Sequence, residues 1–319
     1  QISDNVVDFL IQNLLLLPAK TLNILKLASC IGNDFDLKTI WEICDDRMNF
    51  SDALRIGIKK EYIVSVDNNQ RFLDLEAEEC LNSNIKMVFR FNHSRIQQAL
   101  YSLISNNDKK TIHYRIGKVL LKPYDNKKIP GNKLFEITNH LNLGSNIITD
   151  KEERLQLVDL NLNAANKAKR NLAYGTAKNY YATGIKVLSD NEWHEFPEKL
   201  FNLSLNHVEA CYLSGDIDNI LALCDDLLKL ATCDIEKAMV YELKGKILDH
   251  IGEDRKIIVD EIKKGLKILG MDLPTDPKEI DSQIGAGIAK MQSYLATNSI
   301  EEIANLPEIK DDNLIMVMK

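Results

Sequence analysis

Apolar residues recur along most of this chain with the 3.6-residue period of an amphipathic helix. Near the start the pattern predicts helices over residues 4–16, 21–31, 36–44 and 51–60. Pro18 is expected to end the first helix and start the second, because proline is tolerated at a first helical turn, and Gly32 is expected to close the second. Asp36 and Ser51 are predicted to cap the third and fourth helices by accepting backbone hydrogen bonds.

The pattern changes to that of β-strands between residues 62 and 91. Runs of β-branched and aromatic residues predict strands over 62–66 and 87–91, and 71–75 is a candidate third strand. A further helix is expected over 93–104. Three helices followed by a short hairpin are the layout of a winged helix, so we predict a winged-helix domain with a short β wing over 1–105.

Beyond residue 106 the pattern is helical throughout, so the predicted fold class is mainly α. Helices over 110–121 and 132–143 form a helical connector, 106–150. Residues 151–319 are predicted to be an array of tetratricopeptide-like helical repeats, because Gly215 and Gly252 mark turns 37 residues apart, close to the ~34-residue unit. The predicted helix pairs are 155–169 with 174–188, 198–213 with 217–231, 235–250 with 255–269, and a weaker pair over 278–303.

Composition limits the class of protein. The chain has 319 residues, is 45% hydrophobic and carries a formal net charge of −7, so it is too apolar for a disordered chain. Its best apolar run, 14–17, stops at Pro18 and is far short of the ~20 residues that span a bilayer. Neither an initial Met nor a signal segment is present, which favours a piece of a longer cytoplasmic polypeptide.

Residues that carry chemistry are scattered. The six Cys form no C-x-x-C pair, the six His form no H-E-x-x-H, and no phosphate-binding loop or nucleophile elbow is present. We therefore expect no metal, no cofactor and no catalytic residue in this fragment, with Cys30, Cys211 and Cys224 as buried, inert thiols. Gly285 and Gly287 follow no strand, so a close helix contact or a flexible end is favoured over a dinucleotide loop.

DNA binding is the alternative function that a winged helix suggests: a transcription-regulator fragment with a repeat sensor domain. The candidate recognition helix carries Arg55, Lys59 and Lys60. Residues 1–105 nevertheless hold eleven Lys or Arg against fourteen Asp or Glu, and this formal −3 opposes binding to phosphate. Carboxylate clusters, Asp45-Asp46 among them, leave a hidden enzyme as a further alternative, although such runs are usually solvated faces.

An interaction module is the remaining class. Stacked helix pairs form a concave surface suited to a protein or peptide partner. Tyr174, Tyr181, Tyr212 and Tyr241 are candidate residues of that surface, although aromatics at helical spacing are more often packed between helices.

Four stretches resemble one known family. FRFNHSRIQQALYSLI at 89–104 is similar to its F-x-F-x-H-D-R-[VI]-Q-x-A-x-Y-S-L-I signature, and FEITNHLNLG at 135–144 to its I-x-x-H-x-N-x-G stretch. GLKILGMDLP at 265–274 resembles its G-x-x-x-L-G-x-x-L-P segment, and 25–37 resembles the region just after its nucleotide-binding core. The family is the STAND-type ATPase module of bacterial and fungal multidomain proteins that join a serine/threonine kinase-like domain, an ATPase and a sensor histidine kinase.

The resemblance implies a role for the chain and for two residues. The fragment would follow an ATPase core that binds ATP or ADP with Mg in the parent protein, and its partners would be that core and other domains of the same chain. His93 would contact the nucleotide phosphate, with Arg95 as a second partner, while the family's Asp is replaced by Ser94. The alternative for His93 is a local helix cap or core residue. In this interpretation the fragment is a non-catalytic relay between partner binding on the repeats and the ATPase core.

Overall fold

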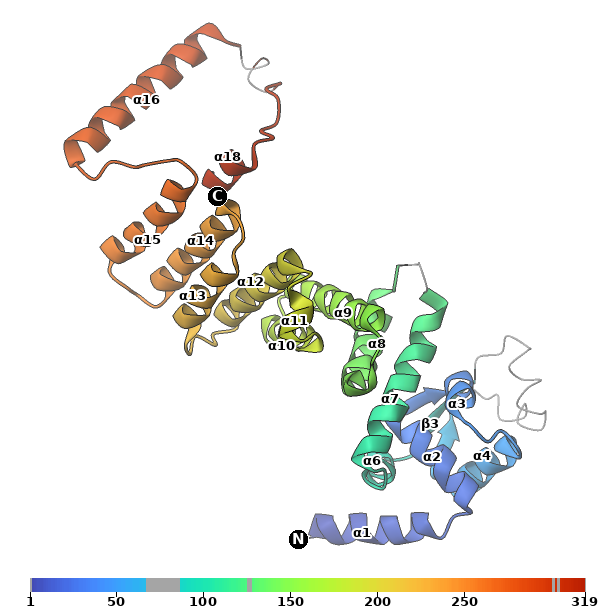
Figure 1. Ribbon diagram of the computed structural model, residues 1–319. Helices are drawn as coiled ribbons and strands as arrows, with labels where there is room; N and C mark the ends of the chain where they lie inside the picture. Colours follow the sequence, from blue (N-terminus) through green and yellow to red (C-terminus); the bar gives the residue numbers. More distant parts are fainter. Residues whose placement is uncertain (1, 67–86, 125–127, 300–301, 303–304, 319) are drawn as a thin grey trace. The chain divides into compact units, whose positions relative to one another are not determined.

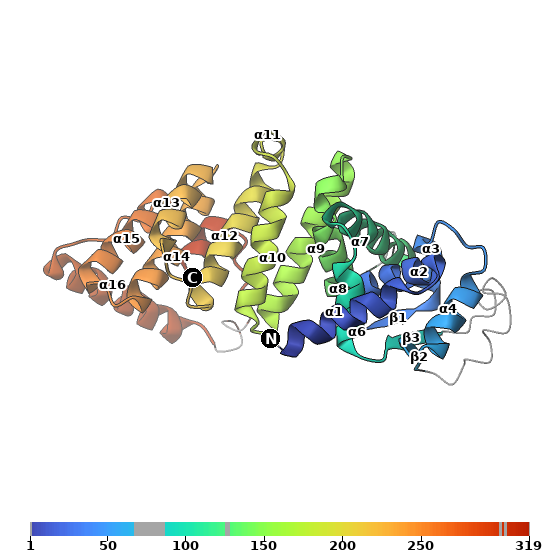
Figure 2. The ribbon, with the colours of Figure 1, turned by 90° about the horizontal axis from the view of Figure 1, so that it is seen from below.

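The computed structural model describes residues 2–66, 87–124, 128–299, 302 and 305–318. Within them the protein is mainly α-helical with a small three-stranded sheet (Figures 1 and 2). The chain divides into two compact units, Gln1–Lys167 and Ala168–Lys319. The three domains predicted from the sequence, with boundaries after residues 105 and 150, stay a prediction.

The first unit combines the sheet with a bundle of helices. Its elements follow one another as α1 (Ile2–Leu15), α2 (Ala19–Ile31), β1 (Asp34–Asp36), α3 (Leu37–Ile43), α4 (Phe50–Lys59), β2 (Ile63–Ser65), β3 (Val88–Phe91), α6 (Ser94–Ser102), α7 (Asn106–Leu121), the 3-10 helix η2 (Lys122–Tyr124), α8 (Gly131–Leu143), the 3-10 helix η3 (Ser145–Ile147) and the start of α9 (Lys151–Arg170).

The sheet is antiparallel, with strand order β1-β3-β2. β2 and β3 lie where the sequence predicted strands. β1 was not predicted, and the proposed third strand at 71–75 lies outside the described residues. In the pairing of β1 with β3, Phe35 lies opposite Phe89. The Arg90 guanidinium donates two hydrogen bonds to the Asp34 carboxylate, with N–O distances of 2.6 and 2.7 Å. The edge strand is thus held both by its backbone ladder and by a bidentate ion pair.

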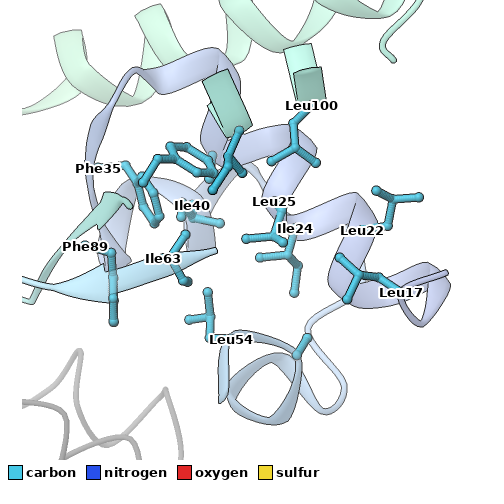
Figure 3. Close-up of a cluster of buried hydrophobic side chains, with 14 of the residues drawn as sticks. Leu17, Leu22, Ile24, Leu25, Phe35, Ile40, Leu54, Ile63, Phe89 and Leu100 are labelled. Atoms are coloured by element: carbon cyan, nitrogen blue, oxygen red, sulfur yellow. The ribbon is translucent and has the colours of Figure 1, made fainter. Parts of the chain in front are cut away.

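The core of the first unit lies between the sheet and helices α2, α3, α4 and α6 (Figure 3). Phe35 from β1 packs against Phe89 and Phe91 of β3, with ring centroids 5.9 and 5.2 Å apart. Leu25 of α2 and Leu54 of α4 are completely buried in the same cluster. The helical apolar stripes and the inner face of the sheet therefore share one core.

Helix ends follow the sequence signals with one exception. Pro18 is the N-cap residue of α2 and Gly32 its C-cap residue, and the Asp36 side chain caps α3 by accepting from the Thr39 N–H. The prediction that Ser51 caps the fourth helix is wrong. α4 begins at Phe50, because a turn stabilised by Met48 N–H bonding to the Asp46 carboxylate starts the helix earlier, with Asn49 in the left-handed region at φ 54°.

Helix α7 joins the α2–α3 side of the core to α8. One of its faces is buried against α2 and α3 in a cluster formed by Cys30, Ile43, Ile104 and Ile116. The other face approaches α8 so closely that a Cβ at Gly117 would lie 2.5 Å from Leu141 Cδ2. A salt bridge from Arg115 to Asp45, with N–O distances of 2.9 and 2.7 Å, adds a polar link to the end of α3.

The second unit is helical in its described residues. Its elements are the end of α9, then α10 (Tyr174–Val187), α11 (Asp190–Trp193), α12 (Pro197–Leu213), α13 (Ile220–Leu230), α14 (Asp234–His250), α15 (Arg255–Ile268), α16 (Pro277–Thr297) and α18 (Asp312–Val317). The weak helical pair predicted over 278–303 is wrong in one respect, because 277–297 is a single continuous helix.

The ends of α9, α12, α14 and α15 share one turn geometry. A left-handed residue follows each helix, namely Leu172, Gly215, Gly252 and Gly270. The next residue then donates its N–H five residues back, for example from Asp216 to the Cys211 carbonyl at 3.0 Å and from Glu253 to the Leu248 carbonyl at 3.0 Å. These are Schellman-type ends, which reverse the chain and satisfy carbonyls at the helix terminus.

Helices α12, α13 and α14 build the core of the second unit. Their buried side chains form one cluster: Phe201, Leu205, Val208, Cys211, Ile220, Cys224, Leu227, Val240, Leu243 and Ile247. Farther along, Met316 of α18 is only 8% exposed. It lines a groove of about 470 Å³ with residues of α14 and α15.

Candidate functional site

Most of the side chains described for residues 89–104 are buried or form hydrogen bonds within the first unit. Phe89 and Phe91 are 1% exposed and belong to the core. The Gln97 amide donates to the Ser29 carbonyl of α2 at 2.8 Å, and the Tyr101 hydroxyl lies 3.0 Å from His113 Nε2. Ile96, Ala99 and Leu100 are buried as well. The side chains at residues 92–95, in contrast, are all exposed.

His93 lies at the junction of β3 and α6. It is the N-cap residue of α6 with extended backbone, and its side chain makes no capping hydrogen bond. Its own carbonyl accepts from the Ile96 N–H at 2.9 Å, which leaves the earlier first-turn N–H groups directed out of the helix. Because a helix N-terminus carries partial positive charge, an imidazole and the Arg95 guanidinium at this end form an arrangement that suits an anion.

The strands hold this junction in place. The N–H of Phe91 donates to the Asn33 carbonyl beside β1, and the N–H of Asn92 donates to the Tyr62 carbonyl beside β2, both at 3.0 Å. Hydrogen bonds from Arg90 hold the pKa of Asp34 below its ordinary value, so that guanidinium is committed to the sheet. Arg95, the other arginine of residues 89–104, is exposed at the start of α6.

The 135–144 stretch has a structural role that the sequence analysis missed. His140 is 7% exposed, and its Nδ1 lies 2.9 Å from Nδ1 of His113 in α7. With Tyr101 the two imidazoles form a buried chain of hydrogen bonds. Desolvation by burial, with the charges of His113 and Lys133, lowers the pKa of His140 to about 4, and burial also lowers the pKa of His113.

Asn142 and Gly144 complete this packing. The Asn142 and Asn161 side chains exchange two hydrogen bonds of 2.9 and 2.8 Å between α8 and α9, and Asn161 is completely buried. A Cβ at Gly144 would lie 2.7 Å from Tyr114 Cβ. The signal available in the sequence was that His113, His140 and Asn161 occupy apolar-face positions of their helices.

The tyrosines predicted for an interaction surface lie in different environments. Tyr181 is completely buried and is therefore a core residue, which corrects its placement on a partner surface. Tyr174, Tyr212 and Tyr241 are half-buried. Tyr212 packs edge-on against His250 with centroids 5.3 Å apart, and Tyr241 packs against Gly265.

One cationic side chain of the predicted DNA-contacting helix forms a salt bridge with a carboxylate. Arg55 of α4 lies 2.8 Å from Asp52 on the same helix. Nearby cations are paired as well: Lys20 lies 2.9 Å from Asp46, and Arg115 binds Asp45. Lys59 and Lys60, at the C-terminal end of α4, are exposed, so the pairing with Asp52 neutralises one of the three cations that the sequence analysis assigned to this helix.

The predicted thiols are buried as expected. Cys30, Cys211 and Cys224 are free and buried, and burial raises the pKa of Cys30 to about 12 and that of Cys224 to about 11. Across the described ranges, no three His, Cys, Asp or Glu side chains are grouped as metal ligands would be. Nor does any helix in those ranges combine the length and apolarity needed to cross a bilayer.

Comparisons with known proteins point to signal transduction. No protein-family model and no solved structure matches the chain. Over 298 residues, covering 79% of this chain, it is 29% identical to a Dictyostelium discoideum protein described as hybrid signal transduction histidine kinase G. The chain spans only 8% of that relative's length. It is therefore similar to one part of a signal-transduction histidine kinase.

Proposed function

We propose that this chain is a non-catalytic regulatory segment of a histidine kinase-type signalling protein. Its similarity to part of a hybrid histidine kinase supports the signalling context. In this proposal the segment receives a protein or peptide partner and passes the effect to an ATPase core of the STAND type that precedes it. That core binds ATP or ADP with Mg, and the whole acts in the cytoplasm.

The arrangement of the first unit supports a winged helix in this role. A helix, a short strand, two helices and a pair of antiparallel strands follow in order, and the sheet order is β1-β3-β2. In the second unit, the recurring left-handed turns at Gly215 and Gly252 support tetratricopeptide-like helix pairs. The formal charge of −3 over residues 1–105 and the pairing of Arg55 with Asp52 favour a protein-facing role for the winged helix over a DNA-facing one.

The nucleotide contact is assigned to His93 and Arg95. The observation that carries the assignment is the contrast within 89–104, where the apolar residues, Gln97 and Tyr101 pack or bond inside the fold while residues 92–95 point to solvent. A helix N-terminus flanked by an imidazole and a guanidinium suits the phosphate groups of ADP or ATP. Binding there would favour a closed arrangement of ATPase core and winged helix.

The test uses the longer protein that includes the preceding ATPase core. In it, H93A or R95A should release a fluorescent ADP analogue roughly 10–100-fold faster, because each variant removes one charge-assisted hydrogen bond. Q98A is the matched control, since Gln98 is exposed on the same helix one turn later. Release rates equal to those of the parent in both variants would remove this end of α6 from the mechanism.

A further inference from the structure

Helix α16 is the longest helix of the second unit and has no buried side chain. Its six large apolar residues are between 37% and 57% exposed: Ile280, Ile284, Ile288, Met291, Tyr294 and Leu295. At 3.6 residues per turn they fall within about 120° of the helix circumference. α16 therefore presents a continuous apolar stripe that the rest of the described chain leaves uncovered.

Four of the six apolar side chains are placed symmetrically about the middle of the helix. Ile284 lies three residues before Gly287, and Met291 lies three after Ile288. Ile280 lies seven residues before Gly287, and Leu295 lies seven after Ile288. A second copy of α16 running in the opposite direction would therefore place Ile280 against Leu295 and Ile284 against Met291, twice over.

Gly287 falls on the same stripe at the centre of this symmetry. Nothing in the described structure lies within 4 Å of a Cβ placed there, so the glycine is not required by contacts within its own unit. A missing side chain at the crossing point lets two helix backbones approach closely.

Charge does not oppose the pairing. The helix carries two cations and two anions, Lys278, Lys290, Glu279 and Asp281. In the antiparallel register Asp281 lies opposite Tyr294 and Lys290 lies opposite Gly285, so no like charges meet. This matters because a twofold contact brings each surface against itself and would double any like-charge repulsion.

We propose that α16 is a self-association helix that pairs antiparallel with α16 of a second copy of this chain, with its crossing point at Gly287 and Ile288. One helix pair is smaller than a standard interface of about 800 Å² per partner. The dimer is therefore concentration-dependent, and association is strengthened wherever other parts of a parent protein also bring two copies together.

Sedimentation of the full chain tests the surface. The chain should shift from monomer to dimer as its concentration rises towards about 200 µM. I284K should weaken association at least about 10-fold, since each dimer would bury two lysines against the partner's Met291. A289K is the matched control, because Ala289 is exposed on the opposite side of the same helix and receives the same charge.

Cross-linking tests whether the two α16 helices pair antiparallel or parallel. In a background with Cys80 and Cys233 replaced by serine, a mixture of I280C and L295C chains carrying different tags should cross-link to each other with a short bis-maleimide. Each variant alone should give little cross-linked dimer. I280C cross-linking to itself would show parallel pairing and overturn the proposed register.

Two sedimentation results and one thermal-unfolding result would overturn the proposal. The first is a monomer at all concentrations, and the second is equal dimerisation of I284K and A289K. The third is a loss of thermal stability in monomeric I284K, but not A289K, at concentrations where the unsubstituted chain is itself monomeric. That last result would mean that the stripe packs within its own chain.

Discussion

We expect the buried histidine pair to make the first unit sensitive to mild acid. His140 lies 2.9 Å from His113 through facing Nδ1 atoms, so the pair holds one proton between these two nitrogens. Burial, followed by the charges of His113 and Lys133, lowers the pKa of His140 from 6.5 to about 4. In the unfolded chain His140 therefore binds a proton at a higher pH than in the folded chain.

The sign of the effect follows from that difference. A folded-state pKa below the unfolded value contributes stability that is complete above pH 6.5 and is lost as pH falls towards 4. At 1.36 kcal/mol per pKa unit, His140 alone should lower the free energy of unfolding by about 2.5 kcal/mol between pH 7.5 and 4.5. His113 adds loss of the same sign, because its pKa is lowered by burial too.

Carboxylates do not produce this window. Hydrogen bonds from Arg90 and Arg115 lower the pKa values of Asp34 and Asp45 from 3.8, so the stability that these pairs add is lost only at more acidic pH. Lys118 and Tyr114 similarly lower the pKa of Glu153 from 4.5. Loss of stability between pH 6.5 and 4.5 in this unit is therefore assigned to the histidines.

Urea unfolding followed by tryptophan emission measures the effect. The chain has two Trp residues, so W193F leaves Trp41, which packs against Phe50 in the first unit with ring centroids 5.2 Å apart. H140Q, which cannot titrate, should flatten the pH dependence by about 2.5 kcal/mol over this range. H93Q is the control, because His93 is exposed. An unchanged slope in H140Q would refute the reasoning.

Three further predictions concern backbone positions. L172G should raise the unfolding free energy of the second unit by about 1 kcal/mol, because Leu172 holds the left-handed conformation at φ 60° and is 72% exposed. A denaturant melt that shows a lower unfolding free energy for L172G would contradict this. G215A, at φ 77°, should lower the unfolding free energy by a similar amount. G144A should destabilise the first unit by about 1–3 kcal/mol in the same assay, since its Cβ would lie 2.8 Å from the Tyr114 nitrogen. G175A in the second unit, where the added Cβ meets open space, should leave the unfolding of the first unit unchanged.

Helices with strong apolar periodicity could be predicted from the sequence, and short polar elements could not. Residues 21–31 carry an uninterrupted helical stripe, and α2 is found at Ala19–Ile31. β1 was not predicted because it is three residues long, with Phe35 between two aspartates. Its strand character comes from pairing with β3, more than fifty residues later in the chain, which no local pattern contains.

The candidate site was predictable in part, for a related reason. His93 and Arg95 were selected by a resemblance between motifs, and the structure adds that their side chains are exposed at a helix start. The His113–His140 pair was missed because its members lie 27 residues apart and each looks like an isolated polar residue on an apolar face. Tyr181 was assigned to a surface because periodicity shows that a residue lies on a helix face, but not which neighbour covers that face.

The two-sided fastening of α7 has a mechanical consequence. Arg115 is tied to Asp45 at the end of α3, while Tyr114 and Lys118 both grip Glu153 of α9 at 2.7 Å. Rolling the helix about its long axis would have to break one set of contacts or the other. α7 is therefore tied by polar contacts to α3 on one side and to α9 on the other, so a rotation that keeps one set of contacts has to give up the other.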